Sequence, residues 1–360
     1  MASCPSPDEL RRVLFAALGV SADLELVRHL GACPRCRARA GRLAARHLHL
    51  SFLAATPTPP SVRTRLEALK GSIGALAEVG ELLHALPRRG GRSYFDRYEV
   101  EAVAGAGAMG LVLRARDPVL DRWVALKILR AHLAADSRAR TMFLAEARAI
   151  AAVEHENVVA IHAVDEYVDR PYLVMQWVEG ESLQARIAAG AVRTVEHLLR
   201  VAVHVARGLA AAHAKGVVHR DINPRNLLLE RVTDRVKIVD FGLAGVRVAA
   251  KCRKPGAVVG TPGYCAPECL EGSAGDERSD LFSLGATLRA ASVGVRGAAG
   301  QVHLPEPFVA LVRTLQLQDP RERPATAREV ATRCEAMLGD RAGGLGCGDR
   351  SRDRGIPRPR

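Results

Sequence analysis

The most chemically suggestive part of the chain is a glycine-rich run at residues 105–110, followed by a lysine and a glutamate. The run lies between two apolar stretches and therefore predicts a turn that joins two strands. Because glycine has no Cβ, backbone amides in such a turn can approach the oxygens of a phosphate group. Lys127 follows in a strand-like run, and Glu146 lies in a helical stretch that could pair with it. This pattern indicates a site for a phosphorylated ligand.

Three later motifs carry further polar side chains in a fixed order. They are the tripeptide 219–221, Asn226 and the tripeptide 240–242. With the glycine-rich run and Lys127, their spacing matches the protein-kinase signature set. From about Tyr98 to Leu338 the chain therefore resembles the serine/threonine protein kinases, and specifically the bacterial eukaryotic-like type. The resemblance implies an α+β, bilobal protein-kinase fold with a β-rich N-lobe and a helical C-lobe.

The resemblance also implies roles for residues in binding ATP and Mg²⁺ (or Mn²⁺). Asp221 would orient the substrate hydroxyl and accept its proton, and Asn226 and Asp240 would hold the metal. Lys127, paired with Glu146, would position the ATP phosphates. Such a set suits phosphoryl transfer, which depends on charge neutralisation and in-line positioning.

The remaining nucleotide contacts implied by the resemblance come from the glycine-rich turn and the hinge. Ala125 and Leu228 would sandwich the adenine, and Met175 would be the gatekeeper; simple core packing would explain all three equally well. The full predicted set is Gly105, Gly107, Gly110, Val112, Ala125, Lys127, Met175, Gln176, Val178, Leu228, Asn226 and Asp240.

The catalytic loop departs from the family at Asn223, where serine/threonine kinases place a lysine that contacts the transferring phosphate. Asparagine cannot neutralise charge. Arg225 occupies the position at which many tyrosine kinases keep an arginine, so we predict that Arg225 replaces the missing cation as a catalytic residue. The alternative is that Arg225 is an ordinary surface arginine of an arginine-rich chain.

The segment that follows contains both familiar and unusual features. Residues 243–260 contain no Ser, Thr or Tyr, so phosphorylation there cannot switch the protein on. Thr261 favours Ser/Thr substrates over Tyr. By resemblance, Glu268 would form a buried ion pair with Arg323, and Asp280 would anchor the catalytic loop.

The helical lobe is shorter than the family usually requires between Leu288 and Phe308. The helix that commonly docks protein substrates is therefore expected to be missing. This places substrate choice in doubt and makes a scaffold role more credible.

The N-terminus carries four residues suited to bind Zn²⁺: Cys4, His29, Cys33 and Cys36. They are soft ligands of the kind that form tetrahedral zinc sites. We expect a helix over Pro7–Leu30, with His29 and Cys33 on one face. The pattern resembles the zinc-binding anti-sigma domain, whereas free thiols beside a surface histidine are the plain alternative.

Composition and linkers suggest four segments: a small all-α zinc-binding domain (1–50), a linker with a helix (51–93), the kinase domain (94–338) and a disordered Gly/Arg/Pro tail (339–360). Residues 56–61 would be a stiff linker and 88–92 a flexible one. The net charge of +13 is concentrated at the two ends. Because aromatic residues make up only 4% of the chain, we expect no nucleic-acid partner.

The sequence shows no apolar run long enough to span a membrane, and we expect a cytoplasmic protein. The predicted function is a serine/threonine protein kinase in bacterial signalling, acting on Ser/Thr hydroxyls of protein substrates. The alternatives are an ATP-binding pseudokinase scaffold and a zinc-dependent anti-sigma-like regulator with a sigma factor as partner.

Overall fold

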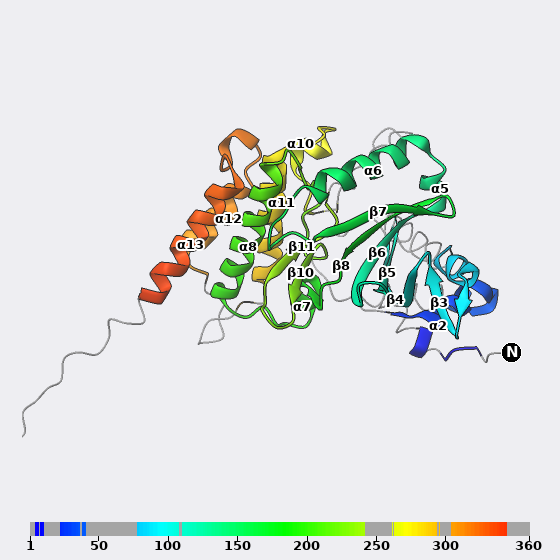
Figure 1. Ribbon diagram of the computed structural model, residues 1–360. Coiled ribbons are helices and arrows are strands. Elements are labelled where there is room, and N and C mark those ends of the chain that lie inside the picture. The colour runs from blue at the N-terminus through cyan, green and yellow to red at the C-terminus, as the bar shows by residue number, and fades with distance from the viewer. Residues whose placement is uncertain are drawn as a thin grey trace, which may run out of the picture.

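The protein folds into a β-rich N-lobe and a helical C-lobe, as the sequence predicts (Figure 1). This computed structural model describes residues 4–6, 8–10, 22–36, 38–40, 78–107, 110–241, 261, 263–293, 295 and 304–343.

An antiparallel sheet with strand order β2-β3-β4-β5-β6-β8-β7 forms the N-lobe. Two helices, α5 (Ala131–Ala134) and α6 (Ser137–Ala151), follow β6. The strands are β2 (Arg88–Arg89), β3 (Arg92–Phe95), β4 (Tyr98–Ala106), β5 (Gly110–Asp117), β6 (Arg122–Leu129), β7 (Ile161–Tyr167) and β8 (Arg170–Gln176).

Hydrophobic patterning explains why β6 lies in the middle of this sheet. Every residue from Val124 to Leu129 is buried, because one face of the strand packs on a cluster that contains Phe95 and Tyr98 and the other packs toward Phe143 of α6. Helix α6 begins after Asp136, whose carboxylate accepts hydrogen bonds from Arg138 N and Ala139 N at 3.0 and 3.2 Å. This central strand carries Lys127.

The C-lobe is built around α8 (Val195–His213), which is buried along most of its length and contacts α11, α13 and β11. Thr194 caps its N-terminus by accepting a hydrogen bond from His197 N at 3.2 Å. The other elements are α7 (Leu183–Ala188), α10 (Pro267–Leu270), α11 (Glu277–Ser292), α12 (Glu306–Leu315), the 3₁₀ turn η1 (Pro320–Glu322), α13 (Ala327–Gly343) and the strands β9 (Gly180–Ser182), β10 (Leu227–Glu230) and β11 (Val236–Ile238).

The described N-terminal residues pack against the N-lobe. Strand β1 (Ala22–Asp23) pairs with β4, and α2 (Leu24–Ala32) follows it. The expected helix over Pro7–Leu30 is therefore wrong at residues 22–23, where hydrogen bonding to β4 makes the backbone extended. A second helix, with described residues 78–85, lies beside α2, and both contribute to the cluster that contains the buried face of the sheet.

Two segment boundaries differ from the prediction. Residues 88–92 are not a flexible linker but the β2–β3 hairpin, in which Gly90 and Gly91 take positive φ values of 56° and 79° that favour glycine. Helix α13 continues to Gly343, so the expected tail does not start at residue 339. The predicted linker at 56–61 and residues 344–360 lie outside the described residues. No helix in the described ranges is both long and apolar enough to cross a membrane.

Candidate active site

The loop that holds Asp221 lies between α8 and β10 and is anchored by a buried carboxylate from α11. Asp280 accepts hydrogen bonds from His219 N at 2.8 Å and from Arg220 N at 2.7 Å, and it is fully buried. His213 Nε2 lies 2.9 Å from the same carboxylate. Arg220 has a φ of 65°, an uncommon value for a residue with a side chain, and the hydrogen bonds to Asp280 help to hold the backbone in this conformation. The predicted anchoring role of Asp280 is confirmed.

Thr261 contacts the carboxylate of Asp221 directly. The Thr261 hydroxyl donates to Asp221 Oδ1 at 2.8 Å, and the Thr261 backbone N–H donates to the same oxygen at 3.1 Å. We expected Thr261 only to favour Ser/Thr substrates, and this contact was missed. Its position in the Gly-Thr-Pro-Gly run after the activation segment is the sequence signal that could have suggested it.

Asn223 is a buried bridge within the same network, with 3% of its surface exposed. Its Nδ2 donates to the Asp221 carbonyl at 2.9 Å and to Thr261 Oγ1 at 3.3 Å, while its Oδ1 accepts from Arg225 N at 3.0 Å. A lysine offers only donors and could not accept the Arg225 bond. The amide that replaces lysine therefore has a local role in shaping the loop.

Asn226 and Asp240 lie on two segments that are hydrogen-bonded to each other. Asn226 Nδ2 donates a hydrogen bond to the Asp221 carbonyl at 2.8 Å. This bond fixes the orientation of the side-chain amide, and its oxygen is the atom that could bind a cation. Val239 N donates to the Asn226 carbonyl at 2.9 Å, and His219 Nε2 lies 3.0 Å from the Val239 carbonyl. The predicted metal ligands are thus brought to one place.

Lys127 makes a different ion pair from the one predicted. Its Nζ lies 2.8 Å from Asp240 Oδ1, and only 6% of the residue is exposed. Among the ion pairs between described residues, none joins Lys127 to Glu146, which has interactions of its own. A buried ammonium group needs an anionic partner, and in this structure the Asp240 carboxylate provides it. Lys127 thereby links the N-lobe to the segment that carries a predicted metal ligand.

The glycine-rich turn connects β4 to β5, with residues 108 and 109 outside the described part. Gly107 N donates to the Gly110 carbonyl at 2.9 Å. A Cβ at Gly110 would lie 2.5 Å from the Ile128 carbonyl oxygen, so packing requires glycine there. Among the described residues, a Cβ at Gly105 would meet nothing within 4 Å, and one at Gly107 would meet only the Gly110 oxygen at 4.0 Å. Packing explains Gly110, whereas Gly105 and Gly107 leave room for a ligand.

The residues predicted to contact adenine gather in one apolar cluster. Ala125 and Met175 are register partners on β6 and β8. The backbone N–H of Gln176 donates to the carbonyl of Ala160, the residue before β7, at 2.9 Å. The cluster contains Ala125, Met175 and Val178, with Val112 and Leu228 packed against it.

Comparison with known proteins identifies the family. The model of the protein kinase domain matches residues 98–331. The chain belongs to this family. It is 36% identical over 272 residues to the serine/threonine-protein kinase PknJ of Mycobacterium tuberculosis, covering 68% of this chain and 46% of PknJ. It is 34% identical over 198 residues to PrkC of Bacillus subtilis, covering 55% of this chain and 30% of PrkC. The chain thus spans less than half the length of these relatives.

The fold is also that of solved kinase structures. The crystal structure of the Mycobacterium tuberculosis PknI kinase domain superposes with a TM-score of 0.56 at 25% identity, covering 69% of this chain and 99% of that domain. This agreement supports the assignment of the two lobes.

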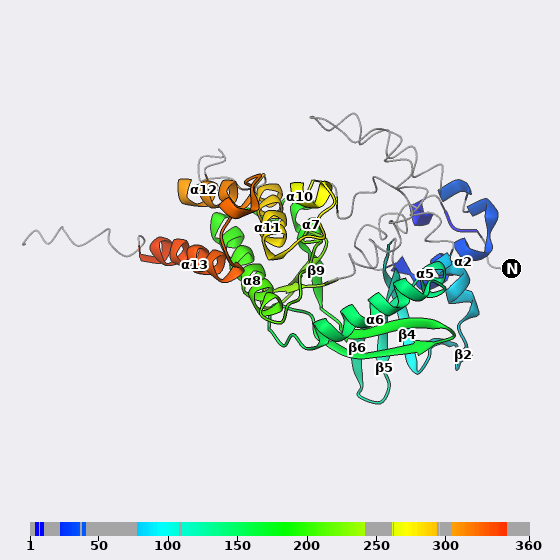
Figure 2. The same ribbon diagram turned by 90° about the horizontal axis from the view of Figure 1, so that it is seen from above.

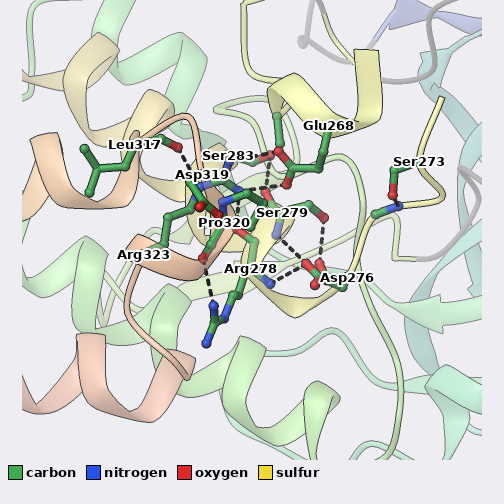
Figure 3. Close-up of polar contacts among 12 residues, drawn as sticks. Glu268, Ser273, Asp276, Arg278, Ser279, Ser283, Leu317, Asp319, Pro320 and Arg323 are labelled. Carbon is green, nitrogen blue, oxygen red and sulfur yellow. Dashed lines mark hydrogen bonds and ion pairs between the residues drawn. The ribbon is translucent and has the colours of Figure 1, made fainter. Parts of the chain in front are cut away.

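The helical lobe contains the predicted ion pair between Glu268 and Arg323 (Figure 3). Arg323 Nη1 and Nη2 donate to the two carboxylate oxygens of Glu268 at 2.7 and 2.8 Å, and the Arg323 side chain is fully buried. Burial tends to raise the pKa of Glu268, but the hydrogen bonds and charge of Arg323 outweigh it and the pKa is lowered. Arg323 also donates to the carbonyls of Leu317, Gln318 and Arg278. The predicted Glu268–Arg323 pair is confirmed.

Arg225 lies on the exposed side of the catalytic loop. Within the described part of the chain no acceptor is hydrogen-bonded to its guanidinium. Its charge acts on Tyr264, where burial raises the pKa of the phenol and Arg225 opposes that rise. The catalytic loop therefore carries an exposed cation at Arg225.

The four predicted zinc ligands come together at the end of α2. The ligand atoms of Cys4, His29, Cys33 and Cys36 all lie within 4.8 Å of one another. His29 Nε2 is 3.3 Å from Cys36 Sγ. Zinc–sulfur bonds of about 2.3 Å place tetrahedral ligands roughly 4 Å apart, so the cluster has a suitable size and donor set.

Proposed function

We propose that this chain is a serine/threonine protein kinase that transfers the γ-phosphoryl group of ATP to protein hydroxyls with Mg²⁺ or Mn²⁺. The observation that carries this proposal is the Asp221 carboxylate, which accepts two hydrogen bonds from Thr261, in a loop where Asn226 donates to the Asp221 carbonyl.

Each residue has a role that follows from its position. Asp221 accepts the proton of the substrate hydroxyl, and Thr261 holds the carboxylate in place for that step. The Asn226 amide oxygen and the Asp240 carboxylate are hard oxygen ligands that suit Mg²⁺, and Lys127 is a cation for phosphate. ATP and its metal, when bound, supply the phosphoryl group and much of the charge neutralisation.

Nucleotide binding has support from the lack of close contacts at Gly105 and Gly107 among the described residues, and from the apolar cluster around Ala125. The turn allows phosphates to approach the backbone, and the cluster offers flat apolar contacts for a base. In this arrangement Lys127 exchanges its contact with Asp240 for one with phosphate, which leaves the carboxylate to the metal. Glu146 remains the proposed partner that steadies Lys127 in that state.

A second cation is proposed at Arg225. Its exposed guanidinium lies on the loop whose lysine position holds a buried amide, and we propose that it contacts the transferring phosphate. Charge at that point stabilises the transition state.

The test is transfer of label from γ-labelled ATP to the chain itself and to a mixture of bacterial proteins, followed by phosphoamino-acid analysis. The kinase predicts metal-dependent label on serine or threonine. Nucleotide binding without any label would instead favour a pseudokinase scaffold.

We further propose that Cys4, His29, Cys33 and Cys36 bind one Zn²⁺. Metal analysis should give one zinc per chain, with loss on Cys33→Ser and retention on Cys265→Ser, a cysteine of the C-lobe. Equal zinc in both variants would contradict the assignment.

Such a site is also compatible with an anti-sigma-type partner function, for which co-purification of a sigma factor is the test. The structure favours an internal role for this segment, because Val27 and Leu30 of α2 are already buried in the N-lobe cluster.

A further inference from the structure

The segment that carries the zinc ligands is continuous with the nucleotide-binding lobe. Helix α2 holds His29 and ends immediately before Cys33. Both views of the molecule show α2 beside the N-lobe strands and away from the helical lobe (Figures 1 and 2). The cluster of buried side chains includes Val27, Leu30 and Cys36 together with Val103 and Leu111, which flank the glycine-rich turn.

A buried arginine next to the metal ligands joins three parts of this assembly. Arg28, with 7% of its surface exposed, donates to the Leu83 carbonyl at 2.9 and 2.7 Å and to Ser93 Oγ at 2.7 Å. It also donates to Glu25 Oε1 at 3.0 Å. One side chain thus connects α2 to the helix at 78–85 and to β3.

The two helices approach each other through glycine. A Cβ at Gly80 would collide with the backbone of Gly31 and lie 2.9 Å from the Val27 carbonyl oxygen. A Cβ at Gly31 would in turn collide with Gly80. Contact this close permits little independent movement, so a shift of α2 must move the helix at 78–85.

Helix α2 and the helix at 78–85 also contact the strands of the proposed nucleotide site. Ahead of α2, β1 pairs with β4 through Ala22–Val103 and Asp23–Ala102, close to Gly105. Glu78, at the start of the described part of the second helix, accepts a hydrogen bond from Ala131 N at 3.0 Å and lies 3.5 Å from Arg130 Nε. That junction directly follows β6, the strand of Lys127.

We propose that metal binding at the Cys4, His29, Cys33 and Cys36 cluster and nucleotide binding at the glycine-rich turn strengthen each other. The proposal rests on the zinc site proposed above. The metal ties the end of α2 to Cys4 and Cys36, and α2 holds the second helix and β4 in place through Arg28, Gly31 and β1. Metal release loosens α2, and the β4–β5 turn then binds nucleotide from a broader set of conformations, at a cost in affinity.

Thermodynamic linkage makes the test reciprocal, because each ligand must change the affinity of the other by the same factor. On the full chain, the Kd of ADP with Mg²⁺ is measured by calorimetry with zinc bound and after its removal. The Kd of Zn²⁺ is measured by competition with a chelator, with and without saturating ADP and Mg²⁺. We expect zinc to tighten ADP binding by about fivefold or more, and ADP to tighten zinc binding by an equal factor.

Two substitutions should break the connection without touching a metal ligand. Arg28→Met removes the hydrogen bonds to Leu83 and Ser93, and Gly80→Val separates the two helices. Both variants should still give the tetrahedral cobalt spectrum of the parent but should lose the mutual effect. Arg39→Met, at an exposed arginine of the same segment, is the matched control and should keep it.

The outcomes separate the two proposals. If zinc binds but the ADP affinity is unchanged, the coupling is contradicted and the zinc site stands. Coupling that persists in both Arg28→Met and Gly80→Val contradicts the proposed route. If no metal binds, the zinc site and the coupling both fail, while the proposed kinase activity is unaffected.

Discussion

The Thr261 hydroxyl donates a hydrogen bond to Asp221 Oδ1 at 2.8 Å, across 40 residues of sequence. This contact joins the end of the activation segment to the proposed catalytic base. Because residues 243–260 contain no hydroxyl side chain, the segment cannot be ordered by its own phosphorylation. Thr261 also accepts a hydrogen bond from Asn223 Nδ2 at 3.3 Å, so two residues of the catalytic loop are bonded to it.

Replacing Thr261 tests this link. Thr261→Val keeps the size of the side chain but removes a hydrogen bond to a charged acceptor, which typically contributes about 1.5–3 kcal/mol. We expect kcat to fall roughly 10-fold to 100-fold with little change in the KM for ATP. Thr261→Ser retains the hydroxyl and should keep most of the activity. Equal rates for the Val and Ser variants would show that the hydroxyl is not needed.

Asn223 provides a test of the loop itself. Asn223→Asp preserves the acceptor for Arg225 N, but removes the donor to Thr261 and the Asp221 carbonyl and buries a second carboxylate close to Asp221. We expect a loss of stability of roughly 1–3 kcal/mol, measured by denaturant unfolding, together with low activity. Asn223→Lys should not be more active than the parent, because a lysine at this buried position offers no acceptor for Arg225 N. An Asn223→Lys variant faster than the parent would contradict the bridging role.

Arg225→Ala tests the proposed second cation. Loss of a transition-state charge contact typically costs ~3 kcal/mol, so we expect kcat to fall about 100-fold. Arg225→Lys keeps the charge and should retain part of the rate. Thermal unfolding should be unchanged in both variants, since the side chain is exposed. Activity in Arg225→Ala equal to that of the parent would identify Arg225 as an ordinary surface residue.

The Glu268–Arg323 pair should dominate the acid sensitivity of the C-lobe. Arg323→Met leaves Glu268 without its partner and should lower the free energy of unfolding by about 3–5 kcal/mol. The pKa of Glu268 is lowered in the fold, so its contribution is present above the unfolded value of roughly 4.3 and is lost as the pH falls through the folded value. Glu268→Gln should therefore be less stable than the parent at neutral pH and lose less stability on acidification. Parallel pH profiles for the two proteins would contradict this assignment.

Much of the catalytic lobe could be predicted because its motifs have fixed spacing. The Asp280 anchor and the Glu268–Arg323 pair were both expected from residues in short recognisable runs, and both are present. Asp280 and Arg323 are buried charges that cannot be left without partners, which ties the sequence closely to these contacts.

The ion pair of Lys127 could not be predicted in the same way. Asp240 and Glu146 are two carboxylates that motif spacing places near one lysine, and spacing alone does not decide which lies closer. The choice depends on the position of α6 and of the segment after β11, which is a property of the packed lobes.

The contacts of the N-terminal segment were even harder to predict from the sequence. Arg28 is one of many arginines in the chain, and Ser93, its hydrogen-bond partner, is 65 residues away. Nothing in the sequence around Gly31 and Gly80 indicates that their two helices lie in close contact. The spacing of Cys4, His29, Cys33 and Cys36 predicted that these side chains could gather, but only the three-dimensional contacts connect the cluster to β4.

The most direct test of the proposed function is the initial rate of γ-phosphoryl transfer by the parent and by Asp221→Asn, which keeps the shape of the side chain but removes its basicity. Both proteins should bind ADP with Mg²⁺ and unfold at similar temperatures. We expect metal-dependent label on serine or threonine in the parent, and a rate at least about 100-fold lower in Asp221→Asn. Equal rates in the two proteins, or no transfer by a parent that binds nucleotide, would contradict it.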